Sequence, residues 1–350
     1  MNGSFAKTLS TLGTPDELWR AAGEHKALPA PQPHNAHVHL PPNFSAFTTV
    51  QQAVSLAQQQ KLVGLGAANY YDYSVYNSFT ALAQKAGVFP LMGLEILSMD
   101  EGLRQAGIKV NDPGNPGKVY LCGKAIAPSA EMFTPQARST IERIREGDAK
   151  RLSEMIDKLE TYLTQQGVRT GLNYQRIVER VVTRHGCPAE TVFLQERHVA
   201  QAFVDVLFEK IAPSQRLEKL STLFGAASKA KTPEDAVTVQ NDLRSHLLKA
   251  GKVAFVPEPF IQLEEARDLV LQLGGIPAYP VLADGATPIC PFEEPVEACI
   301  AQLQNAGFMR WNSSPSATAR KYCCAMSRRF VRLDWWSRLA RNITPLICCQ

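Results

Sequence analysis

Long uncharged apolar runs are missing from this sequence of 350 residues. No stretch reaches the roughly eighteen consecutive apolar residues that a bilayer-spanning helix needs. The first residues, MNGSFAKTLSTLGTPDELWR, also lack the basic region followed by an apolar run that marks a secretory signal. We therefore expect a cytoplasmic protein with no membrane partner.

Motifs of several large enzyme classes are absent as well. The sequence has no P-loop, no GxGxxG fingerprint and no GxSxG elbow, so nucleotide-binding folds and serine hydrolases have no direct support. Its 8 cysteines form neither a secreted disulfide framework nor a CxxC zinc clip. Half of them are scattered singly through the body, and the others form two adjacent pairs near the C-terminal end.

The net charge of +4 is unevenly distributed along the chain. Residues 309–350 contain eight basic residues against Asp334 alone, a net charge of +7. Residues 1–308 contain 29 basic and 32 acidic residues, a net charge of −3. Because this main body has no basic excess to favour a phosphate backbone, we expect no nucleic-acid partner.

The order of sequence patterns predicts an α/β protein with a helical insertion. Residues 1–30 form a leader with one short helical pattern. In residues 31–130, short apolar runs alternate with helical patterns, as in the βαβ units of a parallel sheet. Residues 131–250 have apolar spacing typical of helices. The alternation resumes with KVAFVPEPF in residues 251–308, so we expect the sheet or barrel to continue around the insertion.

The last segment, residues 309–350, departs from both periods and combines adjacent Cys and Trp pairs with Arg and Ser. Read from the third base of each codon, Asp334 followed by Trp335 must encode Leu, the Trp pair must encode Val, and each Cys pair must encode Leu. Free choice at the other codons gives strand-like strings and a loop GTEHN. We interpret the segment as a basic tail translated out of frame; a genuine basic tail is the alternative.

Two histidines form the sharpest chemical feature of the sequence. His37 and His39 flank Val38 at the end of a predicted strand, and side chains two positions apart on a strand point to the same face. Both imidazoles can therefore reach one metal ion. A later predicted strand ends in Glu95, and site residues of parallel α/β folds gather at the C-terminal ends of strands. We expect the three side chains to converge; solvent-facing histidines and a surface carboxylate are the alternative.

Two further residues are candidate catalytic groups. Lys124 ends a predicted strand, where its ammonium could meet a substrate anion. His198 lies near the start of a predicted helix in the insertion and could contact a metal ion or a phosphate. For both residues, a solvated side chain is the alternative interpretation.

The motifs at these positions resemble those of the PHP (polymerase and histidinol phosphatase) domain family. PHP domains begin with HxH after a first strand and later show Gly-x-Glu, and this chain has NAHVHL and MGLEIL at fitting spacings. Asn69 and Tyr70 stand where the family has Asp and His, with Asp72 as a nearby substitute. Tyr279 replaces the histidine of an Ala-His-Pro motif, and a phenol with a pKa near 10 is a poor metal ligand. Only the GTEHN of the other frame would supply the family's last motif.

The resemblance implies an α/β fold of the PHP type, a distorted (β/α)7 barrel with an inserted helical subdomain. It also implies a hydrolase in which His37, His39 and Glu95 hold Zn, Mn or Fe. The ion would lower the pKa of a bound water that attacks the phosphoester of a small phosphorylated substrate.

We expect Tyr70, Asp72 and Tyr279 to line the substrate site. Glu95, together with Lys124 and His198, which are proposed from their places in the sequence, would be the catalytic groups.

The degraded motifs lead us to expect weak or absent phosphoesterase activity, since even losses around the metal ligands cost about 10 to 100-fold in affinity. One alternative is a degenerate module that binds an anionic metabolite or partner through tyrosines at the mouth, namely Tyr70, Tyr71, Tyr73 and Tyr76. Another is an amidohydrolase, because that class also opens with HxH, although its later Lys and His ligands are not evident in this sequence.

Overall fold

The computed structural model describes residues 33–126, 133–282, 288–305 and 310–313. These residues fall into two compact units. The sheet unit takes its residues from within 1–39, 50–138 and 260–350, and the helical unit consists of 40–49 and 139–259. The segment 40–49 thus belongs to the helical unit although it directly follows the predicted HxH strand.

The first sheet of the sheet unit is parallel, in the order β1-β2-β3. Its strands are β1 (His34–Val38), β2 (Gly64–Ala67) and β3 (Phe89–Leu91). Helix α3 (Val50–Gln59) precedes β2, and helix α4 (Val75–Lys85) connects β2 to β3. Both helices bury apolar residues three or four positions apart, as a helix packed on one face must.

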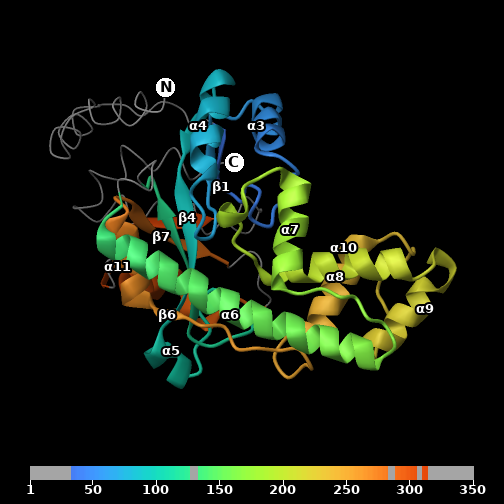
Figure 1. Cartoon of the computed structure of the whole chain (residues 1–350). Helices are drawn as coiled ribbons and strands as arrows, with labels where there is room; N and C mark the ends of the chain where they lie inside the picture. The colour runs from blue at the N-terminus through green and yellow to red at the C-terminus, as the bar shows by residue number, and fades with distance from the viewer. Residues whose placement is uncertain (1–32, 127–132, 283–287, 306–309, 314–350) are drawn as a thin grey trace, which may run out of the picture. The chain divides into compact units, whose positions relative to one another are not determined.

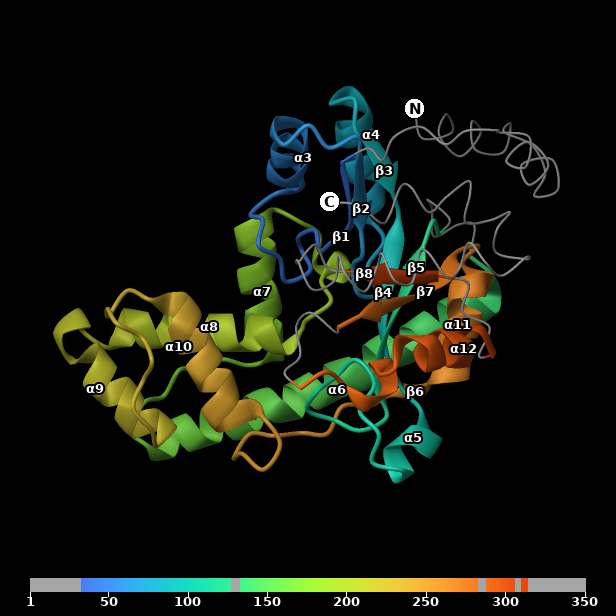
Figure 2. The ribbon, with the colours of Figure 1, turned by 180° about the vertical axis from the view of Figure 1, so that it is seen from behind.

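The second sheet is mixed, in the order β6-β4-β5-β7-β8. Its strands are β4 (Gly93–Met99), β5 (Lys118–Lys124), β6 (Ile261–Gln262), β7 (Ile276–Val281) and β8 (Arg310–Ser313). The central pairs β4–β5 and β5–β7 are antiparallel, and the outer pairs are parallel (Figure 2). Connecting segments contain α5 (Glu101–Gln105), α11 (Leu263–Gln272), the short η4 (Pro291–Glu293) and α12 (Val296–Asn305).

The prediction of a mixed α/β fold is confirmed. The predicted closed barrel is not seen among the described residues, whose strands form two separate sheets. One predicted strand is in fact two. The run VFPLMGLEIL breaks at Met92, so that β3 pairs with β2 in the first sheet whereas β4 pairs with β5 and β6 in the second.

The helical unit contains five α-helices among its described residues (Figure 1). They are α6 (Pro135–Gln165), whose first turn belongs to the sheet unit, α7 (Tyr174–His185), α8 (Glu196–Lys210), α9 (Pro213–Phe224) and α10 (Ala236–Leu243). A short 3-10 helix, η2 (Ala189–Thr191), and a short π-helix, η3 (Arg244–Leu248), complete it. Their apolar faces form one core around the fully buried Ile156, Leu159 and Phe203. The helical pattern of the sequence therefore reflects burial of apolar side chains in this core, with α8 buried around most of its circumference.

Two predicted segments differ from expectation or lie outside the description. The run KVAFVPEPF forms turns and irregular backbone, because Pro257 and Pro259 cannot donate to a strand ladder, while Ala254 and Val256 pack in the helical core. The leader, and the tail beyond residue 313, lie outside the described residues, so their interpretation stays a prediction. The tail's Arg310–Ser313 forms β8 beside β7.

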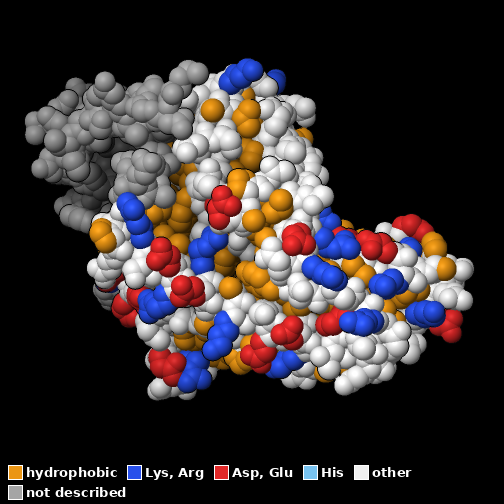
Figure 3. Space-filling model, viewed as in Figure 1, with side chains coloured by type: hydrophobic (Ala, Val, Ile, Leu, Met, Phe, Trp, Pro, Cys, Tyr) orange, Lys and Arg blue, Asp and Glu red, His pale blue; other side chains and the backbone are white. Residues whose placement is uncertain are grey.

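The distribution of charged side chains on the surface and the polarity of the helices can be compared with the sequence patterns. On the face in Figure 3, Lys and Arg side chains are interspersed with Asp and Glu, without one sign dominating. None of the helices in the described ranges combines the length and apolar character needed to cross a bilayer.

Candidate metal centre

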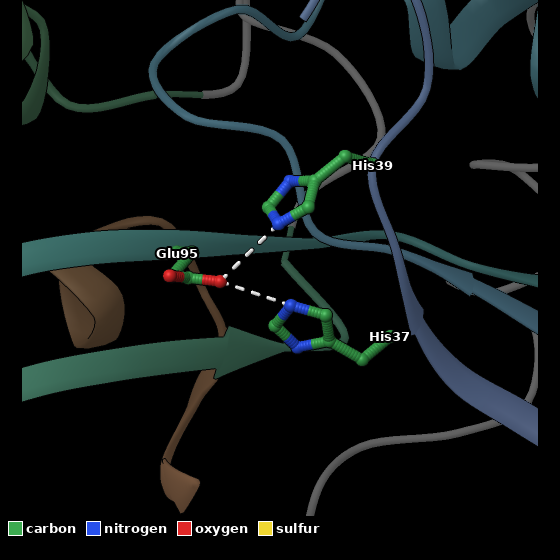
Figure 4. A group of neighbouring side chains, drawn as sticks. All are labelled: His37, His39 and Glu95. Carbon is green, nitrogen blue, oxygen red and sulfur yellow. Dashed lines mark ion pairs between the residues drawn. The ribbon is translucent and has the colours of Figure 1, made fainter. Parts of the chain in front are cut away.

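Three side chains predicted from the sequence lie together in the sheet unit. The Nε2 atom of His37 is 2.9 Å from Oε2 of Glu95, and the Nε2 atom of His39 is 3.4 Å from the same oxygen (Figure 4). One ligand atom from each residue lies within 4.8 Å of those of the other two. The prediction that these residues converge is therefore confirmed.

The strands bring the three residues together in a way that the sequence did not predict. His37 lies at the end of β1 and His39 just after it, as expected, but Glu95 is the third residue of β4 rather than the end of a strand. Its backbone N–H donates to the carbonyl of Asn69, 3.4 Å away, in the loop after β2. The site therefore lies where the start of a strand in one sheet meets the strand ends of the other.

Electrostatics favours an ionised Glu95 carboxylate beside a neutral His37 imidazole. Burial would raise the pKa of Glu95, but hydrogen bonds from His37 and His39 outweigh burial and hold that pKa well below its usual range. Burial lowers the pKa of His37, and the hydrogen bond to Glu95 only partly opposes this shift. A neutral imidazole and an ionised carboxylate are the forms that bind metal ions.

The donor set fits a divalent metal ion. Two imidazole nitrogens and one carboxylate oxygen are the three protein ligands found in one class of catalytic zinc site. An ion about 2.0 to 2.1 Å from two ligand atoms in tetrahedral geometry separates those atoms by roughly 3.3 Å. The separations of 2.9 and 3.4 Å lie close to that value. The histidine side chains are 28% and 26% exposed and that of Glu95 only 9%, so a ligand can approach from the imidazole side.

Two neighbouring side chains hold these groups in place. The Tyr70 hydroxyl donates to Oε1 of Glu95, and its ring stacks on that of His39, with 5.1 Å between ring centroids. Burial raises the pKa of Tyr70 well above its usual value, so the phenol stays protonated. The Cys122 sulfur lies 3.5 Å from Nδ1 of His37, and burial raises the pKa of that thiol to about 12. Both groups are therefore neutral partners that orient the ligands.

Cys122 was missed by sequence reasoning. It lies two positions before Lys124 on β5, directly opposite Glu95 in the antiparallel ladder, so the three side chains share one face of the sheet. The period of two along a strand whose last residue was already a candidate could have identified it.

Lys124 is buried at the end of β5, with 8% of its surface exposed. Its Nζ atom donates to the carbonyl of Ala36, 2.6 Å away, in the residue before His37. Burial lowers its pKa, an effect opposed by the nearby Cys122 and Glu95. Lys124 thus contacts the backbone of the HxH strand.

The other predicted substrate-binding residues have structural partners. Asp72 accepts hydrogen bonds through Oδ1 from the backbone N–H and the hydroxyl of Ser74, at 3.1 and 2.7 Å, just before α4. The buried Tyr279 donates to Oε1 of Glu293 at 2.9 Å. Their substrate-binding roles stay predictions.

His198 lies in the helical unit, near the start of α8. Its Nδ1 atom accepts a hydrogen bond from the backbone N–H of Gln195 at 3.0 Å, and its ring packs edge-on against Phe44, with 5.4 Å between centroids. Burial lowers its pKa to about 3. A neutral, buried imidazole that caps a helix has a structural task, and the catalytic role expected for it stays a prediction.

This buried histidine predicts a pH dependence of stability. The unfolded chain binds a proton at His198 below its ordinary pKa of about 6.5, whereas the folded chain does not until about pH 3. The free energy of unfolding should therefore fall as pH drops through this window, by up to about 1.4 kcal/mol per pH unit from this group, and be fully restored above it. Urea unfolding at several pH values measures this dependence. His198→Asn keeps an acceptor near the Nδ1 position without a titrating ring. The slope of its unfolding free energy against pH should therefore be shallower by about one proton. Equal slopes in the variant and the wild type would show that His198 does not cause the pH dependence.

Comparisons with known proteins place the fold. No family model matches the chain, and no curated protein matches it. A solved structure of a candidate metal-dependent phosphoesterase from Bifidobacterium adolescentis matches with a TM-score of 0.53 and 17% identity, covering 86% of this chain and 85% of that one. An amidohydrolase from Chromobacterium violaceum, solved with bound sulfate and no metal, matches with a TM-score of 0.53 and 16% identity, covering 85% of this chain and 83% of that one. At such identities the likeness concerns the fold, which this chain shares with both proteins.

Proposed function

We propose that this protein is a hydrolase that uses a divalent metal ion, Zn, Mn or Fe, to cleave a phosphoester of a small molecule. The observation that carries the proposal is the convergence of His37, His39 and Glu95, with one ligand atom from each within 4.8 Å of the others. The fold shared with a candidate metal-dependent phosphoesterase supports the choice of reaction.

The chain's own residues would bind and orient the reacting groups. When bound, the ion would supply a water of lowered pKa and polarise the phosphoester. Tyr70 donates to Oε1 of Glu95 and thereby keeps Oε2 turned towards the two imidazoles. Cys122 lies at Nδ1 of His37, on the side of the ring away from Glu95, where a neighbouring group fixes ring orientation.

Two alternatives keep part of this proposal. The likeness to an amidohydrolase favours a metal-dependent enzyme that cleaves a C–N bond instead. The replacement of family motif residues by Asn69 and Tyr70 favours a module that binds an anionic metabolite without turning it over. Because few ligands surround the ion, we expect any turnover to be slow.

Metal-dependent turnover tests the proposal. Protein stripped with a chelator and then supplied with Mn²⁺, Zn²⁺ or Fe²⁺ should release nitrophenol from p-nitrophenyl phosphate at least about tenfold faster than stripped protein, since a bound metal stabilises transition-state charge by several kcal/mol. The His37→Ala variant should lose this stimulation. His34→Ala changes another histidine of β1 that is not part of the cluster and should keep it.

The other outcomes separate the alternatives. Release of nitroaniline from an acyl p-nitroanilide, with the phosphate ester untouched, would favour the amidohydrolase. Inorganic phosphate that binds without any turnover and still binds to His37→Ala would favour the module. Activity that is equal in the stripped, reloaded and His37→Ala proteins would refute a metal-dependent reaction.

A further inference from the structure

Strand β1 contains a bulge where it carries the first metal-ligand candidate. Asn35 pairs with Leu65 of β2, but the next pair is Val38 with Ala67. Two residues of β1, Ala36 and His37, therefore lie opposite one residue of β2. Such an extra residue bends a strand and re-aims its side chains.

The bulge decides which face of the sheet receives the imidazoles. Leu65 and Ala67 are two positions apart and share a face, so their partners Asn35 and Val38 share it too. In a regular strand, side chains two positions apart share a face, so His37 would lie on the face of Asn35. The extra residue of the bulge shifts the alternation by one position and moves His37 to the other face. With the bulge, the residues on either side of Val38 point away from that face and reach Glu95 (Figure 4).

Two features of the first sheet accommodate the bulge. The side-chain oxygen of Asn35 accepts a hydrogen bond from the backbone N–H of His37 at 3.0 Å, a local turn that asparagine favours. Gly66 gives the bulge its space, since a Cβ atom there would lie 2.5 Å from the carbonyl oxygen of Ala36 and 2.6 Å from its carbon. The bulge is thus built from specific residues on both strands.

The third feature comes from the second sheet. Lys124 lies opposite Gly93 in the β4–β5 ladder, and a Cβ atom at Gly93 would meet the Lys124 stem at 3.6 Å. From there its ammonium reaches the carbonyl of Ala36 at 2.6 Å. This carbonyl is the one hydrogen-bond partner of the ammonium among the residues that the structure describes, which include no carboxylate within 4.0 Å of it.

Stability alone is a poor reason for such a group. A buried ammonium loses hydration, and one carbonyl partner together with the nearby Glu95 charge compensates only part of the cost. Even a buried ion pair can often be replaced by apolar side chains of similar volume at no cost in stability, so burial of this charge is no evidence of a stabilising role. A lysine at this position is therefore better explained by a role at the site of His37, His39 and Glu95 than by a contribution to stability.

We propose that Lys124 is a positioning residue that clamps the bulge of β1 and so holds His37 and His39 against Glu95. The inference rests on the proposed metal site, which it deepens. The task differs from the substrate contact that the sequence suggested for this residue, because the ammonium acts through the backbone of Ala36.

The sign of the effect on metal binding distinguishes a clamp from an electrostatic neighbour. Removing a positive charge close to a cation site should by itself strengthen cation binding, since like charges repel. Removing a clamp should weaken it. We therefore expect Lys124→Met to bind Co²⁺ about 10 to 100-fold more weakly than the wild type, the usual cost of losing a group that orients metal ligands.

Matched variants complete the experiment. Lys118→Met removes another buried lysine of β5, which pairs with Asp112 at 3.4 Å, and should leave Co²⁺ affinity and the visible Co²⁺ spectrum unchanged. Lys124→Arg keeps a donor and should restore part of the affinity. If Lys124→Met fails to fold, Lys124→Gln takes its place, because a glutamine side chain is too short to reach the carbonyl of Ala36.

A readout without metal separates this inference from the proposed function. Long-range ¹H–¹⁵N spectra of the histidine rings in metal-free protein report their hydrogen bonds, and the signals of His37 and His39 should shift in Lys124→Met but not in Lys118→Met. If the wild type binds no metal while these signals shift, the proposed function fails and the clamp stands. Unchanged ring signals together with wild-type Co²⁺ affinity in Lys124→Met would overturn the clamp.

Discussion

Glu95→Gln is expected to weaken binding of a divalent ion by more than about 100-fold. Loss of a group that only orients a metal ligand costs about 10 to 100-fold, and loss of a ligand itself should cost more. The substitution keeps the shape of the side chain and a hydrogen-bonding oxygen for Tyr70, but it removes the charge that both imidazoles face. Titration calorimetry with Zn²⁺ or Mn²⁺ and metal content after dialysis measure the loss. The free energy of unfolding of the metal-free protein should also fall, because the two imidazoles favour the ionised form of this buried carboxylate in the folded state.

Glu293→Gln provides the matched control. Glu293 is also a buried carboxylate that accepts a hydrogen bond from a tyrosine, Tyr279, but it does not belong to the group of His37, His39 and Glu95. Its substitution should leave metal stoichiometry at the wild-type value. Equal metal affinity in Glu95→Gln and the wild type would remove Glu95 from the site, and with it the basis of the proposed reaction.

The second large effect is expected at Gly66. A Cβ atom at this position would lie 2.5 Å from the carbonyl oxygen of Ala36, and backbone atoms cannot yield as the end of a long side chain can. Gly66→Ala should therefore push β1 away from β2 and lower the free energy of unfolding by about 1 to 3 kcal/mol, the usual cost of overpacking. Because the displaced residues carry the imidazoles, metal affinity should fall as well.

Gly64→Ala tests whether the effect belongs to the bulge. Gly64 lies on the same strand, but its Cβ atom would meet His34 and Phe89 at ordinary contact distances of 3.6 and 3.8 Å. We expect this variant to be as stable as the wild type or slightly more so, since alanine has less entropy to lose on folding. Urea unfolding and metal titration of both variants compare them. A Gly66→Ala protein that matches Gly64→Ala in both measurements would contradict the role given to the bulge.

Local sequence was enough to find the three candidate metal ligands. The spacing of His37 and His39 follows from the period of a strand, and Glu95 was chosen as the carboxylate at the end of a later predicted strand. Their convergence is confirmed, although the reason given for Glu95 was wrong because it lies near the start of β4. The break at Met92 was missed, since strand propensity does not say which partner a strand will pair with.

Three features could be predicted from residue patterns alone: the alternation of strands and helices, the helical stretch between the two parts of the sheet unit, and the identity of the two histidines and the carboxylate. These depend on side-chain periodicity, which neighbouring residues set. Tertiary packing brings the imidazoles to Glu95. It also places Cys122 next to the His37 ring and Lys124 next to the backbone of Ala36. A bulge exists only relative to the strand it pairs with. The face on which His37 lies therefore depends on Gly66 of β2 and on Lys124 of the second sheet, which are distant from it in sequence.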